Sequence, residues 1–366
     1  MDGTAPKARP RTRRIGGAGR RRPLRKGRWA VFGVGIIGVG RTANAHARAA
    51  AAQPDCAVVA VAEIDEPRGR EFAQARGGIP WHSDFRDLCA RPDVHAVVIT
   101  VPNFLHAPAA LAAIAAGKHV LCEKPLALTA AECTEVAVAA RRAGVRVSVG
   151  HHYHHTGPTL AARAALASAE LDLGPPVMAM DVWHKSFYDP PRRPPWFLDA
   201  AKGGGMWPMN GSHMVDRLMF TTGQRVVSVR ARIGNPFWGL AATDAAHAFL
   251  TFDRGFTAAV AHAGWRDGVN RFETEFVCAR GFLRVTDREV AVGRGRAYEA
   301  LPVPAVDTFS SQFAEFHAAC TAGGRLSAPA EWGGEVVAVL EAAEESSRTG
   351  AEVAVADVLR RAGAGD

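Results

Sequence analysis

The stretch Val34–His46, with the sequence VGIIGVGRTANAH, decides the fold of this chain. It joins an apolar strand to a glycine-rich turn and then to the start of a helix. A pyrophosphate is held by backbone N–H groups that no side chain obstructs, with the positive end of a helix behind them. Glycines leave the backbone open, and the helix supplies the positive end. The stretch therefore predicts a binding site for a dinucleotide.

The glycines can be read in two frames. In the first frame the three motif positions are Gly33, Gly35 and Gly38. In the second frame they are Gly38, Gly40 and Ala43, since alanine is allowed at the third position. The second frame gives a longer preceding strand, 29–37, and places Glu63 about 20 positions further on, at the end of a second apolar run. An acid at that distance binds ribose hydroxyls, so we favour the second frame.

Length and charge predict two domains with a near-neutral folded part. The chain has 366 residues and a net charge of +8. Residues 1–28 carry eleven Lys or Arg and one acid, which gives them +10, so the other 338 residues sum to −2. The high net charge is therefore a property of the tail, and we expect no nucleic-acid partner.

The basic tail, 1–28, is predicted to be disordered because it is rich in Arg, Gly and Pro and its apolar residues follow no helical or strand periodicity. Three roles stay open for it: an extension without function, a basic arm that touches anionic surfaces, or an export signal with a cleavage site near Ala47. Cleavage at Ala47 would remove the first strand and the glycine turn. We therefore assign these residues to the strand.

The six cysteines are widely scattered, and no Cys-x-x-Cys pair occurs. This pattern predicts neither a zinc ribbon nor a redox pair, but reduced thiols in a cytoplasmic protein. No apolar run reaches the length that spans a membrane, so no membrane partner is expected. The run 151–155, HHYHH, resembles a metal cluster, but on a strand its alternate side chains would face opposite ways. We therefore expect substrate contacts from Tyr153 and His154 and no metal.

Strands and helices alternate from residue 29 to about residue 150, which is typical of a doubly wound parallel (Rossmann) sheet in an α/β protein. The predicted strands are Trp29–Ile37, Ala57–Glu63, Ala96–Thr100, His119–Cys122 and Val145–Val149. The predicted helices are Thr42–Ala52, Arg68–Ala75, Pro108–Ala116 and Ala130–Ala143.

A second domain, of α+β type, is predicted over 151–366. Its alternating segments, without helices between them, indicate a large and mainly antiparallel open sheet. They are Ala245–Phe252, Thr257–Trp265, Arg271–Cys278 and Phe282–Thr286, followed by helices at Ser310–Thr321 and Glu331–Arg348. One face of this sheet needs a cover from outside the chain, so we expect a homo-oligomer, a dimer or a tetramer.

Polar residues follow two of the predicted parallel strands, where ligands of such sheets bind. Pro102, Asn103 and His106 come after Ala96–Thr100 and are expected beside the cofactor, although His106 could simply belong to a Pro-Asn turn. Glu123-Lys124-Pro125 comes after His119–Cys122. A lysine before proline, in a bond that can be cis, is held in the crevice and can serve acid–base chemistry. A surface lysine before a turn is the alternative.

The segment 203–216, GGGMWPMNGSHMVD, supplies a histidine and an acid about one helical turn apart, His213 and Asp216. A histidine with a pKa near neutrality can take a hydroxyl proton as a hydride leaves. A structural histidine that supports the start of a helix is the other interpretation.

Together these motifs resemble the glucose–fructose oxidoreductase, inositol dehydrogenase and rhizopine catabolism (Gfo/Idh/MocA) family. The likeness runs from about Trp29 to Val355. It rests on five ordered motifs: Gly38-Val39-Gly40, Pro102-Asn103…His106, 115–120 leading into Glu123-Lys124-Pro125, Gly203-Gly204-Gly205 with Gly211…His213…Asp216, and Glu344…Ser347-Arg348-Thr349-Gly350.

The resemblance implies an oxidoreductase that uses NAD(P) and acts on a CH–OH group of a sugar, polyol or related cyclic alcohol. It implies that Lys124 assists proton transfer or orients the substrate and that His213 handles the proton. Family members often have Asp four residues before that histidine, where this chain has Met209, with Asn210 beside it. His154 stands where many relatives have Arg.

The expected cofactor contacts come from Gly38, Gly40, Arg41, Thr42, Ala43, Glu63, Pro102, Asn103, His106, Glu123 and Lys124. The expected substrate contacts come from Asn210, His154, Tyr153 and Asp216, with Lys124 and His213 as catalytic residues and a small molecule as substrate. NAD is favoured over NADP because Glu63 would repel a 2′-phosphate, although Arg68 softens that repulsion. The neutral Met209 keeps an alternative open: an NAD-binding hydrolase, lyase or sensor without net dehydrogenase activity.

Overall fold

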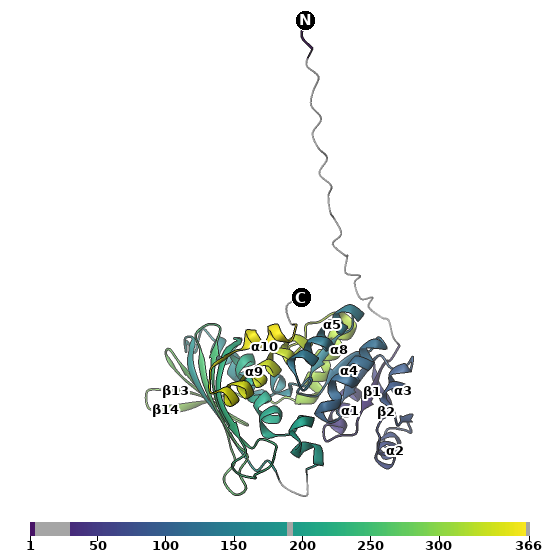
Figure 1. The fold of residues 1–366 in the computed structure, drawn as a ribbon, viewed down its shortest axis with the longest axis horizontal. Helices are drawn as coiled ribbons and strands as arrows, with labels where there is room; N and C mark the ends of the chain where they lie inside the picture. Colours follow the sequence, from purple (N-terminus) through teal and green to yellow (C-terminus); the bar gives the residue numbers. More distant parts are fainter. Residues whose placement is uncertain (4–29, 189–192, 364–366) are drawn as a thin grey trace.

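The protein is described here from a computed structural model, which covers residues 1–3, 30–188 and 193–363. The predictions for the basic tail fall on 4–29 and lie outside the described residues. Figure 1 shows two sheets at opposite ends of the molecule, with helices α9 (Ala330–Thr349) and α10 (Val355–Arg361) between them.

The first sheet has six parallel strands in the order β3-β2-β1-β4-β5-β6, which confirms the predicted doubly wound fold. Its strands are β1 (Phe32–Ile37), β2 (Cys56–Ala62), β3 (Trp81–His82), β4 (Ala96–Ile99), β5 (His119–Cys122) and β6 (Val147–Val149). Its helices are α1 (Ala43–Ala51), α2 (Glu66–Gln74), α3 (Phe85–Ala90), α4 (His106–Ala115) and α5 (Ala130–Ala143).

Local chemistry explains where these helices begin. Asp65 caps α2 by accepting a hydrogen bond from the Arg68 backbone N–H, so this helix starts two residues before the predicted Arg68. Thr129 and Glu132 form a reciprocal capping box on α5, and Gly144 ends that helix in the left-handed conformation. The short pair β3 and α3 was not predicted, because neither is long enough to show a periodic pattern.

The second sheet has nine strands in the order β14-β13-β12-β11-β7-β10-β9-β8-β15. The four predicted segments form β9 (Ala245–Phe252), β10 (Thr257–Ala263), β11 (Arg271–Cys278) and β12 (Gly281–Thr286). The remaining strands are β7 (Pro176–His184), β8 (Val226–Gly234), β13 (Val290–Arg294), β14 (Ala297–Leu301) and β15 (Val353–Ala354). The sheet is mainly antiparallel, as expected, but β7 and β10 pair in parallel.

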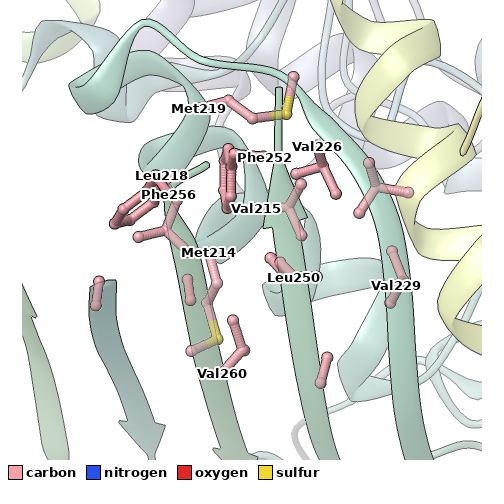
Figure 2. Close-up of a cluster of buried hydrophobic side chains, with 14 of the residues drawn as sticks. Met214, Val215, Leu218, Met219, Val226, Val229, Leu250, Phe252, Phe256 and Val260 are labelled. Atoms are coloured by element: carbon pink, nitrogen blue, oxygen red, sulfur yellow. The ribbon is translucent and has the colours of Figure 1, made fainter. Parts of the chain in front are cut away.

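One face of this sheet is covered by helix α7 (Ser212–Thr222) and by α9. In Figure 2, Met214, Val215, Leu218 and Met219 of α7 pack against side chains from β8, β9 and β10. Helix α6 (Gly157–Ala167) packs beside α7 and belongs to the same core. Apolar side chains stay exposed on the opposite face, among them Met178, Met180, Phe249 and Phe282.

Helix α8 (Thr308–Ala322) returns from the second sheet to the first domain, where it packs on α1. Phe313 and Phe316 of α8 share a core cluster with Phe32 and Val34 of β1. The strand spacing considered for 151–155 does not apply, because His152–His155 form a short 3-10 helix, η2, between β6 and α6. In the described part of the chain, no helix combines the length and the apolar character needed to cross a bilayer.

Candidate active site

The glycine turn lies between the end of β1 and the first turn of α1. Gly38 has a φ of 85°, and a Cβ at Gly40 would lie 2.5 Å from the Thr100 carbonyl oxygen at the end of β4. The turn therefore requires glycine, because it approaches the neighbouring strand more closely than a side chain permits. Helix α1 begins at Ala43, directly behind the turn. This arrangement agrees with the second reading of the motif and suits a diphosphate.

Glu63 ties the turn to the end of β2. Its carboxylate accepts hydrogen bonds from the backbone N–H of Val39 at 2.6 Å, from that of Asp65 at 3.0 Å and from the Arg68 guanidinium at 2.7 Å. Burial alone would raise the pKa of Glu63, but the hydrogen bonds outweigh it and lower the pKa. The carboxylate stays charged and holds the turn in shape, while the Arg68 side chain remains half exposed.

Asn103 and His106 follow β4 as predicted, but they face protein rather than open space. The Asn103 amide donates to the Gly203 carbonyl at 2.8 Å and contacts the Met209 sulfur at 3.0 Å. The ring nitrogens of His106 lie 2.6 Å from the Pro125 carbonyl oxygen and 3.0 Å from the Val101 carbonyl oxygen. The cofactor contact expected from His106 is thus not supported, because backbone groups occupy both ring nitrogens of a buried side chain.

Lys124 occupies the crevice at the carboxyl end of β5, and its bond to Pro125 is cis. Its ammonium donates a hydrogen bond to the Met209 carbonyl oxygen at 2.7 Å. Burial lowers the pKa of Lys124 to about 8, opposed by the charge of Glu123 and assisted by that of Arg41. Near neutral pH this lysine can therefore both give and take a proton.

Glu123 is held by a histidine of α1. Its carboxylate lies 2.9 Å from His46 Nε2. Burial favours a raised value, but the hydrogen bond and the charge of His46 dominate and lower the pKa of Glu123 to about 2. The cofactor contact predicted for Glu123 stays a prediction, since its carboxylate is already engaged with α1.

His213 lies in the first turn of α7, inside a group of aromatic rings. Its ring meets those of His152 and Tyr153 edge-on, with centroids 4.9 Å and 5.0 Å away, and that of Trp183 at 6.2 Å. Burial, followed by the charge of Lys124, lowers the pKa of His213 well below its ordinary value. The imidazole is thus neutral at physiological pH and can accept a hydrogen bond from a hydroxyl group.

Asp216 and His154 form a buried network behind His213. The Asp216 carboxylate accepts a hydrogen bond from Trp332 at 2.7 Å, lies 2.8 Å from His154 Nε2 and 3.4 Å from His151 Nδ1. Both Asp216 and His154 are almost fully buried. The substrate contacts predicted for these two residues are therefore not supported, because their polar atoms are directed at each other and at α9.

Asn210 and Tyr153 keep positions from which a ligand can be reached. Asn210 lies in the π-helical turn Trp207–Gly211 before α7, and its amide nitrogen is buried with no hydrogen-bond partner among the described residues. Tyr153 is half buried, stacks on Phe272 and lines a cavity of about 480 Å³ with His152 and Arg217. Their substrate contacts stay predictions.

Comparison with known proteins agrees with this geometry. Residues 32–151 match the family model of the oxidoreductase family with an NAD-binding Rossmann fold (GFO_IDH_MocA). Residues 159–284 match the model of the GFO/IDH/MocA C-terminal domain. The chain belongs to the GFO/IDH/MocA family. It is an oxidoreductase with an NAD-binding Rossmann domain, as the motifs indicated.

Relatives of this family member are named for several substrates. The chain is 29% identical over 311 residues to 1,5-anhydro-D-fructose reductase of Ensifer adhaerens, covering 82% of this chain and 91% of that protein. It is 31% identical over 234 residues to 1-carboxy-3-chloro-3,4-dihydroxycyclohexa-1,5-diene dehydrogenase of Comamonas testosteroni, covering 63% and 58%. An oxidoreductase domain protein from Kribbella flavida has a similar structure, with a TM-score of 0.81, 25% identity and coverage of 89% and 100%.

Two residues of this GFO/IDH/MocA protein were missed at the sequence level, Trp183 and Lys185. Trp183 stacks near His213, and the Lys185 ammonium lies 4.7 Å from the centre of the Trp183 ring. The signal that could have found them is the alternation of Asp181, Trp183 and Lys185 along one face of β7 and its continuation. Within 30–188 and 193–363, no three His, Cys, Asp or Glu side chains are grouped to hold an ion.

Proposed function

We propose that the protein transfers a hydride between the nicotinamide of NAD or NADP and a CH–OH carbon of a sugar, polyol or related cyclic alcohol. One observation carries the proposal: the Lys124 ammonium is held on the carbonyl of Met209, one helical turn before the neutral His213. The charge of Lys124 lowers the pKa of His213, which supports a common role for this amine and this imidazole. Relatives named as reductases and dehydrogenases of sugars and polyols support the same reaction class.

The residues present fit a dinucleotide. The Gly38–Ala43 turn with the start of α1 would hold its diphosphate, with Arg41 and Thr42 beside it, and Glu63 with Arg68 would meet its ribose. When bound, the nicotinamide supplies the hydride acceptor. Lys124 would take the hydroxyl proton of the substrate, since the pKa of its amine is close to working pH, and His213 would orient that hydroxyl. The amide of Asn210 is available to a second hydroxyl.

Replacing Lys124 by Ala tests the proposal. We expect kcat to fall by about 10²–10⁴-fold, the usual size of a general acid–base contribution, with dinucleotide affinity changed by less than about threefold. Turnover is followed at the NADH absorbance band with pooled polyols, aldoses and cyclic dihydrodiols. Lys202→Ala is the matched control, because Lys202 is an exposed lysine paired with Asp199. Unchanged turnover in the Lys124 variant would remove this residue from the mechanism.

We further propose NAD as the preferred cofactor, with NADP as a weaker substitute. The Glu63 carboxylate stays ionised and would repel a 2′-phosphate, while the half-exposed Arg68 reduces that repulsion. The ratio of kcat/KM for NAD to that for NADP should fall in Glu63→Gln and rise in Arg68→Gln. A wild-type preference for NADP would contradict this assignment.

A second function is kept open by Met209, a neutral residue whose carbonyl oxygen, and no carboxylate, accepts the hydrogen bond from Lys124. In that case the protein would bind NAD tightly but show no net dehydrogenase activity, as a hydrolase, lyase or sensor. Copurified dinucleotide with no NADH formed across the whole substrate panel would favour it over the dehydrogenase.

We also propose that the protein is a homo-oligomer and works in the cytoplasm. The open face of the nine-stranded sheet exposes Met178 and Met180 on β7, Phe249 on β9 and Phe282 on β12. Arg230 on β8 pairs with Phe249 at one edge of this apolar strip, and Glu275 on β11 lies within the strip, opposite Met180. In a two-fold dimer the same face of each copy covers that of the other, so we take a second copy as the cover. The six free cysteines suit a reducing compartment.

A further inference from the structure

The crevice contains a second lysine that the reaction described above does not use. Lys185 directly follows β7, and its backbone N–H continues the sheet by bonding to the Ala263 carbonyl oxygen at 3.0 Å. Its ammonium lies 4.7 Å from the centre of the Trp183 ring and 5.8 Å from that of Phe187. The aromatic faces attract the cation but carry no formal charge to neutralise it.

The charges around Lys185 are positive. Burial, together with the charges of Arg193, Lys124 and Arg41, lowers the pKa of Lys185 to about 8. No carboxylate pairs with the Lys185 ammonium among the residues that the structure describes. The nearby acids are engaged elsewhere: Glu123 with His46 and Asp216 with histidines and Trp332.

Unpartnered polar atoms lie around the same lysine. His262 pairs in register with Trp183, is almost fully buried, and has no hydrogen-bond partner for either ring nitrogen among the described residues. The Trp183 ring lies 5.9 Å from that of His262 and 6.2 Å from that of His213. Buried polar groups normally have partners, so a site with several unpartnered ones indicates a polar ligand.

We propose, on the basis of the function proposed above, that the substrate carries an anionic group, a carboxylate or a phosphate, which Lys185 binds while the reacting hydroxyl lies between Lys124 and His213. A partly buried ammonium near three other cations is costly, and an anion offsets that cost directly. Met209 agrees with this assignment, because a neutral side chain beside Lys124 leaves the crevice positive. Trp183 would form an apolar wall between the anion site and the reacting carbon.

Arg41 belongs to the dinucleotide turn and would meet the diphosphate, and Lys124 is assigned to the reacting hydroxyl. Lys185 belongs to the other sheet, on the Trp183 side of His213, where the diphosphate is not expected. A cofactor role for Lys185 is therefore the competing explanation, and it predicts weaker dinucleotide binding when the lysine is removed.

Matched pairs of compounds test the proposal: D-glucuronate with D-glucose, D-gluconate with D-sorbitol, and D-glucose 6-phosphate with D-glucose. In the wild-type protein we expect the anionic member of at least one pair to have a kcat/KM at least tenfold higher. Lys185→Gln should raise KM for that anion by about 10–100-fold, the range for a lost charge-assisted hydrogen bond. It should leave KM for the neutral member and the Kd of the dinucleotide within about twofold.

Lys185→Arg should restore most of the anion affinity, since it keeps the charge, and Lys202→Gln serves as the surface control. If Lys185→Gln does not fold, calorimetry of the same pairs on the NAD-loaded wild-type protein gives the answer directly. A preference for the neutral members, equal losses for both members, a weaker dinucleotide Kd in Lys185→Gln, or no binding of any anion would overturn the proposal. Anion binding without any turnover would support the anion site while rejecting the dehydrogenase.

Discussion

Glu123 stays charged inside the protein because His46 lies against its carboxylate. The pKa of about 2 is below the ordinary value of 4.5, so ionised Glu123 stabilises the folded state above about pH 4.5. That contribution is lost as the pH falls from about 4.5 to about 2.

We predict that Glu123→Gln lowers the free energy of unfolding by about 2–3 kcal/mol at pH 7, because one side of the buried pair is lost. The difference from the wild type should shrink towards pH 2. Urea unfolding at pH 7, 4 and 3 measures both effects. Glu66→Gln is the control, since Glu66 is in an exposed pair with Arg70 that contributes little. A difference that stays constant with pH would show that the charge is not the cause.

The pH dependence of the reaction should identify the proton-transferring group. If Lys124 accepts the hydroxyl proton, kcat/KM for alcohol oxidation rises about tenfold per pH unit below 8 and levels off above it, because the free amine forms through its pKa of about 8. His213 cannot produce that step, since its pKa is lowered well below 6.5. Initial rates between pH 6 and 10 measure the profile. A profile without a step near pH 8 would remove Lys124 from this role.

The sequence could place the residues of the site, but not the direction in which each side chain points. Lys124 and His213 were predictable because each follows directly from a strand end or a helix start. His106, His154 and Asp216 lie in the same segments, yet their side chains turn inward to carbonyl groups and to one another. Those partners come from distant parts of the chain, such as Trp332, and no local pattern contains them.

At the scale of the element, the conformation of the glycine turn depends most strictly on the residue type at one position. In Gly40→Ala the new Cβ would lie 2.5 Å from the Thr100 carbonyl oxygen, so the turn has to move away from β4. We expect dinucleotide affinity to fall at least tenfold, about 1.4 kcal/mol or more, while the fold is kept. Gly334→Ala is the matched control.

Gly334 lies inside α9, where an added Cβ makes only ordinary contact with Cys133. Its replacement by Ala should leave dinucleotide binding unchanged and raise stability by about 0.5–1 kcal/mol. Calorimetric titration of NAD and thermal unfolding of the two variants provide the comparison. Equal affinities for both would mean that the turn does not grip the diphosphate.

Elements with a clear periodic pattern of apolar residues were predictable from the sequence. Elements whose conformation depends on tertiary contacts were not. The Rossmann strands are continuous apolar runs in the sequence because both their faces are covered. In β9 to β12, buried and more exposed residues alternate clearly. The 3-10 turn at His152–His155 has no signal in the sequence, and strand spacing was considered there to argue against a metal cluster. Its geometry follows instead from the backbone connection between β6 and α6.

At the scale of the whole molecule, the open sheet face should set the state of assembly. Met180 is 58% exposed and Phe249 is 50% exposed at the centre of this face. The double variant Met180→Glu, Phe249→Glu should convert the oligomer to monomers, because it places charges in a buried apolar contact. Sedimentation velocity measures the change, with Val269→Glu as the control at an exposed turn position. An unchanged sedimentation coefficient, or a monomeric wild type, would contradict the proposed interface.

Because α8 returns to the first domain, the first domain cannot be separated from the rest of this enzyme by cutting the chain near residue 150. Phe313, Phe316 and Cys320 complete the apolar layer against β1, and the Val149 N–H bonds to the Ala328 carbonyl oxygen at 2.8 Å. A fragment ending near residue 150 would lose that layer and present Phe32 and Val34 to water. The nucleotide half is thus not a transferable module: grafting or truncating it would require the late helix to be supplied as well.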